Sequence, residues 1–207
     1  MKAALLLVVV LDGIALTDAH DERLMPNLAA FRRDGLEYRH VESPGSTIPA
    51  MMMVRDALPR AEWFSSWPSL CEMVECHTSR HDTFTVADAV HAMRTRETAM
   101  RQIVVHLVEA DLEAHAADSA LTGKGVDIGR AAYEAEITKT DAHARTLWNA
   151  CVAYRKCTMV LLTDHGRTRG NWRKHGDDED SRRAWALVVG GAAGVVDRRV
   201  SFADVLK

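Results

Sequence analysis

The stretch Thr158-Met-Val-Leu-Leu-Thr-Asp164-His165-Gly166 decides the fold, because its apolar run breaks abruptly into an acid, an imidazole and a glycine. A buried strand ends in this way when it delivers polar groups to a site at its carboxyl edge. Asp164 and His165 offer one oxygen and one nitrogen ligand, a pairing suited to zinc or manganese. A strand that merely ends in a turn also carries Asp and Gly, for conformational reasons. The stretch therefore indicates a metal site only if other strand ends supply further ligands.

Two other apolar runs of the chain also end in acidic residues. The valine- and leucine-rich run 3–11 leads directly into Asp12 and a glycine. The run 103–108 leads into Glu109-Ala-Asp111, and His115 follows four residues later. Continuous apolar runs of this length are typical of parallel strands that are buried on both faces.

Helical patterns separate these strands along the chain. Pro26 marks a helix start and Gly35 its end, and Gly129 precedes a long helical stretch that reaches about residue 154. Other predicted elements are a helix beginning near Pro49, a helix over 84–100, and strands over 36–41 and 184–189. Strands that alternate with helices predict a doubly wound, mostly parallel α/β sheet flanked by helices. Without a linker or a repeat, residues 1–207 are interpreted as a single domain.

Composition argues against several classes of protein. Hydrophobic residues make up 47% of the 207 residues and the net charge is −3, so no nucleic-acid-binding surface is indicated. No apolar stretch reaches the length of a membrane span. The run 3–11 imitates a signal peptide, but it is short and lacks a convincing cleavage site, so we interpret it as the first strand.

The cysteines bear on the cellular compartment. The four of them, Cys71, Cys76, Cys151 and Cys157, form no CxxC pair and lack the density of a secreted disulfide scaffold. We therefore predict reduced thiols and a cytoplasmic location.

A turn-rich segment, Ser43-Pro-Gly-Ser46-Thr47-Ile-Pro49, places two adjacent hydroxyls before a predicted helix. A hydroxyl at a helix N-terminus lies where backbone N–H groups and the helix dipole favour an incoming anion. A Ser/Thr N-cap is the simpler interpretation of the same pattern, and such caps are common. The segment by itself leaves both interpretations open.

The polar residues that follow the strands can meet in space. The carboxyl ends of the strands in a doubly wound sheet share one edge, which brings together residues that are distant in sequence. The residues concerned are Asp12, Asp111, His115, Asp164, His165 and the loop residue His175. These acids and histidines suffice for two metal ions if a hydroxyl such as that of Thr47 contributes a ligand. Two ions about 4 Å apart are a standard arrangement for in-line displacement at phosphorus.

The ordered series of motifs resembles the alkaline phosphatase superfamily, which also contains nucleotide pyrophosphatases/phosphodiesterases, sulfatases and cofactor-independent phosphoglycerate mutases. The resemblance covers nearly the whole chain and depends on the order of several short motifs. These are Val-Leu-Asp12-Gly, Met25-Pro-Asn-Leu-Ala-Ala-Phe-Arg-Arg-Asp-Gly, Ser43-Pro-Gly-Ser-Thr47-Ile-Pro-Ala, Glu-Ala-Asp111-Leu-Glu-Ala-His115, Thr-Asp164-His165-Gly and His175-Gly.

The resemblance implies a metal-dependent phosphoric-ester hydrolase, a phosphatase or a phosphodiesterase, with a small-molecule phosphate ester as substrate. It implies two divalent ions, with Zn²⁺ preferred and Mn²⁺ as the alternative. One ion would be held by Asp12, Thr47, Asp164 and His165, and the other by Asp111, His115 and His175. Thr47 is the expected nucleophile, because Thr47-Ile-Pro resembles the Thr-x-Pro pattern of the phosphodiesterase branch, and Ser46 is the alternative. Metal coordination lowers the pKa of such a hydroxyl, and its attack on phosphorus gives a phospho-threonine intermediate.

The chain also departs from patterns within the superfamily. Sulfatases have Cys or Ser followed by x-Pro-x-Arg, and usually a second aspartate where this chain has Gly13. The sequence Thr47-Ile-Pro-Ala-Met51 lacks that arginine, which argues against sulfate esters. The Thr-Gly pair that usually follows the nucleophile helix is absent, and the length leaves no room for the inserted domain of the mutases.

Two further functions remain open from the sequence. One is a phosphotransferase or mutase of the same superfamily, and the other is a catalytically silent metal-binding relative that serves as a binding module. The sequence also does not select the basic side chain that would face the phosphoryl oxygens, for which Arg55, Arg167 and Lys174 are candidates.

Overall fold

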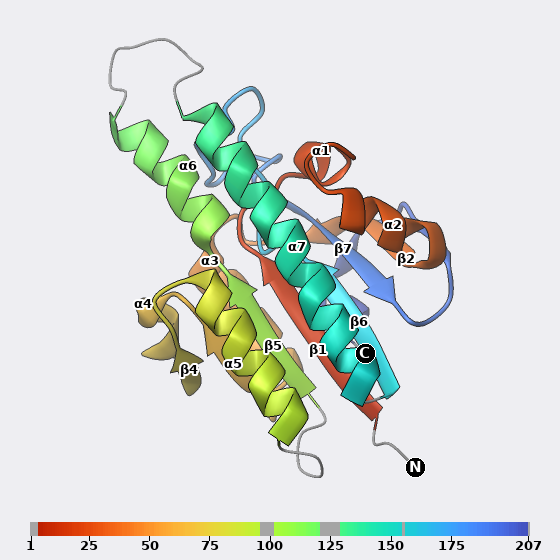
Figure 1. Ribbon diagram of the computed structural model, residues 1–207. Coiled ribbons are helices and arrows are strands. Elements are labelled where there is room, and N and C mark those ends of the chain that lie inside the picture. The colour runs from red at the N-terminus through yellow and green to blue at the C-terminus, as the bar shows by residue number, and fades with distance from the viewer. Residues whose placement is uncertain (1–3, 96–101, 121–128, 155, 207) are drawn as a thin grey trace.

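The computed structural model describes residues 4–95, 102–120, 129–154 and 156–206 (Figure 1). The strands are β1 (Ala4–Leu11), β2 (Leu36–Glu42), β3 (Glu62–Ser65), β4 (Cys76–Thr78), β5 (Gln102–Leu107), β6 (Lys156–Leu162), β7 (Arg183–Val189), β8 (Gly194–Val196) and β9 (Val200–Ser201). The helices are α1 (Leu16–Ala19), α2 (Pro26–Asp34), α3 (Thr47–Ala57), α4 (Pro68–Cys71), α5 (Asp82–Thr95), α6 (Glu109–Ala120), α7 (Arg130–Tyr154) and α8 (Phe202–Val205). In this part of the chain no helix is long and apolar enough to cross a membrane.

One sheet forms the centre of the molecule, with the strand order β4-β3-β5-β1-β6-β7-β2-β8 and with β9 paired to β2. The central strand β1 pairs in parallel with β5 on one side and with β6 on the other. The predicted mostly parallel α/β fold is therefore confirmed. Strand β7 is a departure from the parallel direction, since it runs antiparallel to both β6 and β2.

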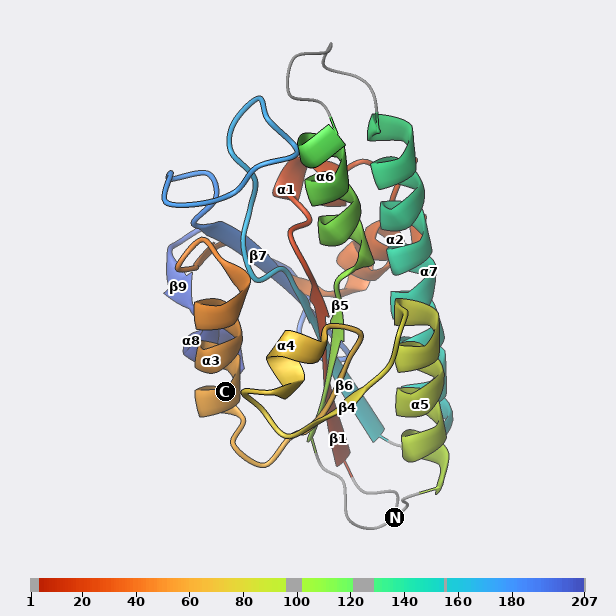
Figure 2. The same ribbon diagram turned by 90° about the vertical axis from the view of Figure 1, so that its left-hand side faces the viewer.

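Helices cover both faces of the sheet (Figure 2). Helices α2, α5 and α7 lie against one face, where Leu7 and Val9 of β1 are fully buried. Helices α3, α4 and α8 lie against the other face, where Val8 and Val10 are fully buried. Burial on both faces explains why this strand is continuously apolar.

Helix α6 and the loop after β6 extend beyond the carboxyl ends of the central strands (Figure 2). Because β5, β1 and β6 are parallel neighbours, the residues that follow them meet at this edge of the sheet. The fold thus places Asp12, Asp111 and Asp164 in one region, as the sequence predicts.

Helix boundaries follow local signals with small shifts. Helix α2 begins at Pro26 and ends before Gly35, as predicted, and Asp141 of α7 caps it by accepting hydrogen bonds from the backbone N–H groups of Asn27 and Leu28. Helix α3 begins at Thr47, two residues before Pro49 and so near the predicted start, and Pro49 lies within its first turn, where proline is accepted. The predicted helix over 84–100 corresponds to α5, and residues 96–101 lie outside the described residues.

The prediction of reduced thiols is wrong. Cys71 is bonded to Cys76, and Cys151 is bonded to Cys157. Each pair joins the end of a helix to a nearby strand start, α4 to β4 and α7 to β6. Spacings of five and six residues do not match a familiar disulfide pattern, so only the approach of the chain segments in space identifies the pairs.

Candidate metal centre

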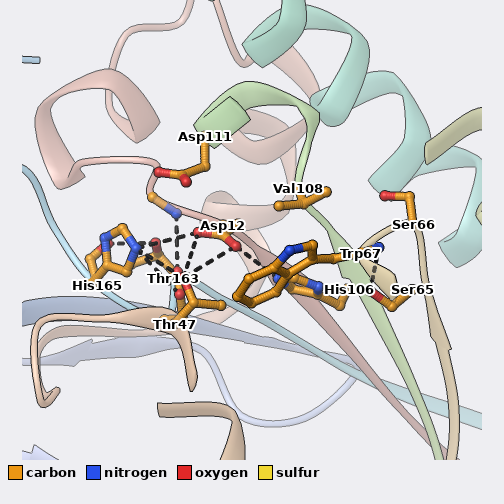
Figure 3. A network of polar contacts seen from close by, with 12 residues as sticks. Asp12, Thr47, Ser65, Ser66, Trp67, His106, Val108, Asp111, Thr163 and His165 are labelled. Carbon is orange, nitrogen blue, oxygen red and sulfur yellow. Dashed lines mark hydrogen bonds and ion pairs between the residues drawn. The ribbon is translucent and has the colours of Figure 1, made fainter. Parts of the chain in front are cut away.

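Residues from four segments converge beyond the ends of β1, β5 and β6 (Figure 3). Asp12 follows β1, Asp164 and His165 follow β6, and Asp111 stands in the first turn of α6. Thr47 is the first residue of α3, and its side chain points toward Asp12 and His165. All five residues are buried.

The first predicted ligand set is closely spaced. The hydroxyl of Thr47 lies 3.3 Å from Oδ1 of Asp12 and 3.3 Å from Nε2 of His165. Nε2 of His165 lies 3.3 Å from Oδ1 of Asp12 and 3.4 Å from Oδ2 of Asp164. In a tetrahedral zinc site with ligand distances of about 2.0 to 2.1 Å, the ligand atoms are about 3.3 to 3.4 Å from one another. These four separations therefore match such a site.

The second predicted set lies next to the first. Nε2 of His115 is 3.2 Å from Oδ2 of Asp111 and 3.0 Å from Nε2 of His175. The ring of His175 stacks on the ring of His165, with centroids 3.8 Å apart. Ligand atoms of Asp111, His165 and His175 lie within 4.8 Å of one another, so His165 lies between the two sets instead of belonging only to the first.

The histidines are oriented as metal ligands usually are. Nδ1 of His165 donates to the carbonyl of Gly166 at 3.0 Å, and Nδ1 of His175 donates to the carbonyl of Gly45 at 3.1 Å. These hydrogen bonds fix both rings and leave each Nε2 facing the carboxylates. Metal-binding histidines commonly donate their other ring nitrogen to a backbone carbonyl in this way.

Two buried carboxylate oxygens make the centre suitable for a cation. Oδ2 of Asp164 has no hydrogen-bond donor among the described residues, and neither has Oδ1 of Asp111, whose charge the guanidinium of Arg167 at 2.7 Å partly offsets. A buried carboxylate oxygen without a donor is costly unless a cation or a proton offsets its charge. The oxygen and nitrogen donors of this centre therefore fit divalent zinc or manganese.

The pKa values show how strongly the carboxylates attract positive charge. Burial opposes ionisation of Asp12, but hydrogen bonds from His106 and His165 outweigh it and hold the pKa of Asp12 well below its usual range. Asp164 lacks such donors, and burial together with the charge of Asp12 raises its pKa to about 6. Burial disfavours the charged form of His165, but the charges of Asp164 and Asp12 raise its pKa overall to about 9. A divalent cation would replace these protons.

Gly13 and Arg167 border the second set. Gly13 has a φ of +62°, and a Cβ atom there would lie 2.5 Å from Nη2 of Arg167 and 2.6 Å from Oδ1 of Asp111. The guanidinium of buried Arg167 approaches that same Asp111 oxygen at 2.7 Å, although the angles do not meet those of a hydrogen bond. Arg167 also donates to the carbonyl of Gly13 at 2.7 Å. Of the basic candidates, Arg167 thus contacts a predicted ligand, whereas Arg55 pairs with Asp56 in an exposed position.

The two candidate nucleophiles have different surroundings. Ser46 is the N-cap residue of α3, but its side chain makes no capping hydrogen bond. Only the hydroxyl of Thr47 is placed by recorded hydrogen bonds against Asp12 and His165. The geometry therefore places Thr47, and not Ser46, against the candidate ligands.

A pocket of about 280 Å³ opens onto the centre. Ile48, Trp67, Val108 and Leu112 form its apolar wall. Its polar lining consists of Asp12, Ser46, Thr47, Asp111, His115 and His175, and no Lys or Arg is among the described residues that line it. The pocket thus combines an apolar wall with the acids, histidines and hydroxyls of the centre.

Sequence reasoning missed His106 and Asp82. His106 is fully buried on β5 and contacts Asp12 through Nε2 at 2.9 Å. Asp82 accepts hydrogen bonds from the backbone N–H groups of Val108 and Glu109 and so fixes the start of α6, which carries Asp111. His106 could have been found from the sequence, because it is a histidine inside the otherwise apolar run 103–108. No comparable sequence pattern distinguishes Asp82.

Comparison with known proteins supports the fold. No protein-family model matches the sequence, and no curated protein sequence matches it. Among solved structures, the zinc complex of the C-terminal periplasmic domain of EptC from Escherichia coli is similar, with a TM-score of 0.68, 12% identity and coverage of 100% of this chain and 81% of that domain.

Two other solved structures are similar to the same extent. A protein of the alkaline phosphatase superfamily from Vibrio parahaemolyticus has a TM-score of 0.70 and 10% identity, and the alignment covers 100% of this chain and 65% of that one. The lipoteichoic acid synthase LtaP from Listeria monocytogenes has a TM-score of 0.64 and 10% identity, with coverage of 98% and 70%. The resemblance read from the sequence is therefore confirmed at the level of structure: the chain has the fold of the alkaline phosphatase superfamily.

Proposed function

We propose that the protein is a metal-dependent enzyme that cleaves phosphoric esters, with Thr47 as the nucleophile. The observation that carries the proposal is the spacing of Thr47, Asp12 and His165, whose ligand atoms lie 3.3 Å from one another, with Oδ2 of Asp164 3.4 Å from Nε2 of His165. A nucleophile that is itself placed among metal ligands is suited to activation by the ion. We further propose two divalent ions, with zinc preferred over manganese.

The residues of the centre have separable roles in such a reaction. Bound ions would supply charge that lowers the pKa of the Thr47 hydroxyl and offsets the charge on the phosphoryl oxygens. Thr47 loses its hydroxyl proton to solvent and forms a bond to phosphorus, while the bond to the leaving group breaks and the departing alkoxide takes up a proton from solvent, which leaves a phospho-threonine. Asp111, His115 and His175, which line the pocket, would hold the second ion. Water then breaks the bond between Thr47 and phosphorus and regenerates the enzyme.

The charge of the pocket favours a diester over a monoester. A monoester carries two negative charges near neutral pH and a diester carries one. No Lys or Arg is among the described lining residues, and Arg167 is engaged with Asp111. The apolar wall that includes Trp67 can hold the second organic group of a diester.

A transferase is the second candidate function. It shares the phospho-threonine step and differs in using an alcohol, not water, to release the phosphoryl group. The similarity to LtaP, which is named as a lipoteichoic acid synthase, favours this candidate. A silent metal-binding module is the remaining alternative, and it would bind the ions without turning over either ester.

We also propose that the protein functions in an oxidising compartment. The predicted cytoplasmic location depended on reduced thiols, and both cysteine pairs are bonded. Disulfides persist mainly in oxidising compartments. The similar EptC domain is described as periplasmic.

The decisive experiment measures turnover of bis-p-nitrophenyl phosphate and p-nitrophenyl phosphate by zinc- or manganese-loaded and chelator-treated protein. We expect metal-dependent turnover with the diester preferred. Thr47→Ala should lower kcat/KM about a thousandfold or more, because it removes the nucleophile. Ser46→Ala is the matched control and should stay within a few-fold of the unmodified protein.

Three outcomes would change the proposal. Protein that binds no metal and turns over neither ester would refute it. Metal binding without turnover would favour the silent module. With an added alcohol such as glycerol, a larger yield of the transferred phosphodiester than of the hydrolysis product would favour the transferase.

A further inference from the structure

Asp12 also takes part in a second set of hydrogen bonds, with buried residues of β3 and β5 (Figure 3). Nε2 of His106 lies 2.9 Å from Oδ2 of Asp12. Nδ1 of the same ring lies 2.9 Å from the hydroxyl of Ser65, which also accepts from the backbone N–H of Trp67 at 3.0 Å. His106 and Ser65 have no exposed surface.

The donors and acceptors in this set of hydrogen bonds can be assigned by starting from Trp67. The N–H of Trp67 can only donate, so the Ser65 oxygen accepts there. The Ser65 hydroxyl hydrogen then goes to Nδ1 of His106, since no other acceptor for it is recorded among the described residues. Nδ1 is therefore an acceptor, and Nε2 carries the hydrogen that is donated to Asp12.

We propose that His106, oriented by Ser65, is a positioning residue that holds the Asp12 carboxylate in the orientation needed to bind the metal ion. This inference rests on the proposed metal-dependent function. The His106 bond holds Oδ2 of Asp12, which also lies 3.4 Å from the Thr47 hydroxyl, and leaves Oδ1 at 3.3 Å from both that hydroxyl and Nε2 of His165. Groups that hydrogen-bond to metal ligands typically set ligand orientation and affinity in this way.

The surroundings of His106 argue against a role that is limited to packing in the hydrophobic core. Its neighbours on β5, Val105 and Leu107, are buried apolar residues, and an apolar side chain at 106 would avoid burying two ring nitrogens. Ser65 likewise ends β3 with a fully buried side chain, two residues before the pocket residue Trp67. Both polar side chains are hydrogen-bonded, and the series of hydrogen bonds that they form ends on the predicted metal ligand Asp12.

The test compares zinc affinity in four variants of the full chain. His106→Asn keeps an amide near the Nδ1 position and loses the donor to Asp12. His106→Gln can place its amide nitrogen near the Nε2 position and restore that donor. Ser65→Ala removes the group that orients the ring, and Leu147→Ala in α7 is a control that leaves a core cavity far from the centre. The readouts are the zinc dissociation constant, measured by chelator competition, and the visible spectrum of the cobalt-loaded protein.

We expect His106→Asn to bind zinc about 10- to 100-fold more weakly than the unmodified protein and to change the cobalt spectrum. His106→Gln should recover most of the zinc affinity, and the affinity of Ser65→Ala should lie between those of the two His106 variants. Leu147→Ala should have the zinc affinity and the cobalt spectrum of the unmodified protein. In the catalytic assay, the loss in His106→Asn should appear in kcat and not in KM.

The positioning role would be overturned if folded His106→Asn had the zinc affinity and the cobalt spectrum of the unmodified protein. It would also be overturned if His106→Gln bound zinc as weakly as His106→Asn. If His106→Asn does not fold by circular dichroism, the cobalt spectrum of Ser65→Ala decides, and no change there overturns the role. An unmodified protein that binds no metal would instead refute the proposed function, and this inference with it.

Discussion

Replacing Asp164 by asparagine should stabilise the metal-free protein while weakening metal binding. Asp164 has no exposed surface, its Oδ2 has no donor among the described residues, and its Oδ1 accepts from the N–H of Gly13 at 3.0 Å. Asparagine keeps that acceptor, removes the charge that opposes Asp12, and offers an N–H₂ group where Oδ2 stood. The substitution therefore removes a repulsion that only a cation or a proton relieves in the unmodified protein.

The size of the stability gain in Asp164→Asn and its dependence on pH follow from the pKa of Asp164. Burial and the Asp12 charge raise the pKa of Asp164 from 3.8 to about 6. A carboxyl with a raised pKa contributes its full stability below pH 3.8 and loses it as the pH rises to about 6. A shift of about two pKa units corresponds to at most about 3 kcal/mol of unfolding free energy. At about 2 to 4 °C per kcal/mol, the variant should gain up to roughly 10 °C in Tm above pH 6 and nothing near pH 4.

The assay is thermal unfolding at pH 4 and pH 8, with chelator and with zinc. Asp12→Asn is the matched control, since hydrogen bonds from His106 and His165 lower the pKa of Asp12 and its charge therefore stabilises the protein above its unfolded pKa. Without metal at pH 8, Asp12→Asn should be less stable and Asp164→Asn more stable than the unmodified protein. Zinc should raise the Tm of the unmodified protein by more than that of either variant. Equal destabilisation by both variants at pH 8, or a gain for Asp164→Asn that persists at pH 4, would refute the reasoning.

Two further predictions concern the backbone at the centre and the disulfides. Gly13→Ala should lower the Tm and the number of zinc ions bound per chain, measured by elemental analysis, because its Cβ would displace the Arg167–Asp111 pair. Gly170→Ala, with a φ of +73° and no atom within 4 Å of the added Cβ, is the control for backbone strain alone, and equal zinc loss in both would contradict the prediction. In unfolded, non-reduced protein, none of the four cysteines should react with a thiol reagent. Reduction should lower the unfolding free energy by about 2 kcal/mol for each of these short loops, and reactive thiols before reduction would contradict the pairing.

Local sequence signals were sufficient for the main elements of the fold. Nearly continuous apolar runs identify β1, β5 and β6, since burial on both faces of a parallel strand disfavours polar residues, and His106 of β5 is a buried exception. Pro26 and Gly35 mark the ends of α2, because proline is favoured in a first helical turn and glycine ends helices readily. The antiparallel direction of β7 had no such signal, because an apolar strand looks alike in either direction.

The candidate ligands could be selected from the sequence because they share one feature, a position directly after a buried strand. Their pairing could not be selected in the same way. His165 contacts the first set and stacks on His175 of the second, which depends on ring orientations fixed by two backbone carbonyls. The bonded cysteines likewise depend on segments that meet only in the folded chain.

The sequence by itself determined the doubly wound architecture and the edge of the sheet at which the chemistry lies. Both follow from short-range patterns, namely apolar periodicity and the residue types that end each strand. Only the tertiary structure decided that His106 and Ser65 support Asp12, that Arg167 occupies the space above Gly13, and that Oδ2 of Asp164 is left without a donor among the described residues. These are contacts between residues far apart in sequence, and their energies depend on burial and on separations of a few ångströms that no local pattern encodes.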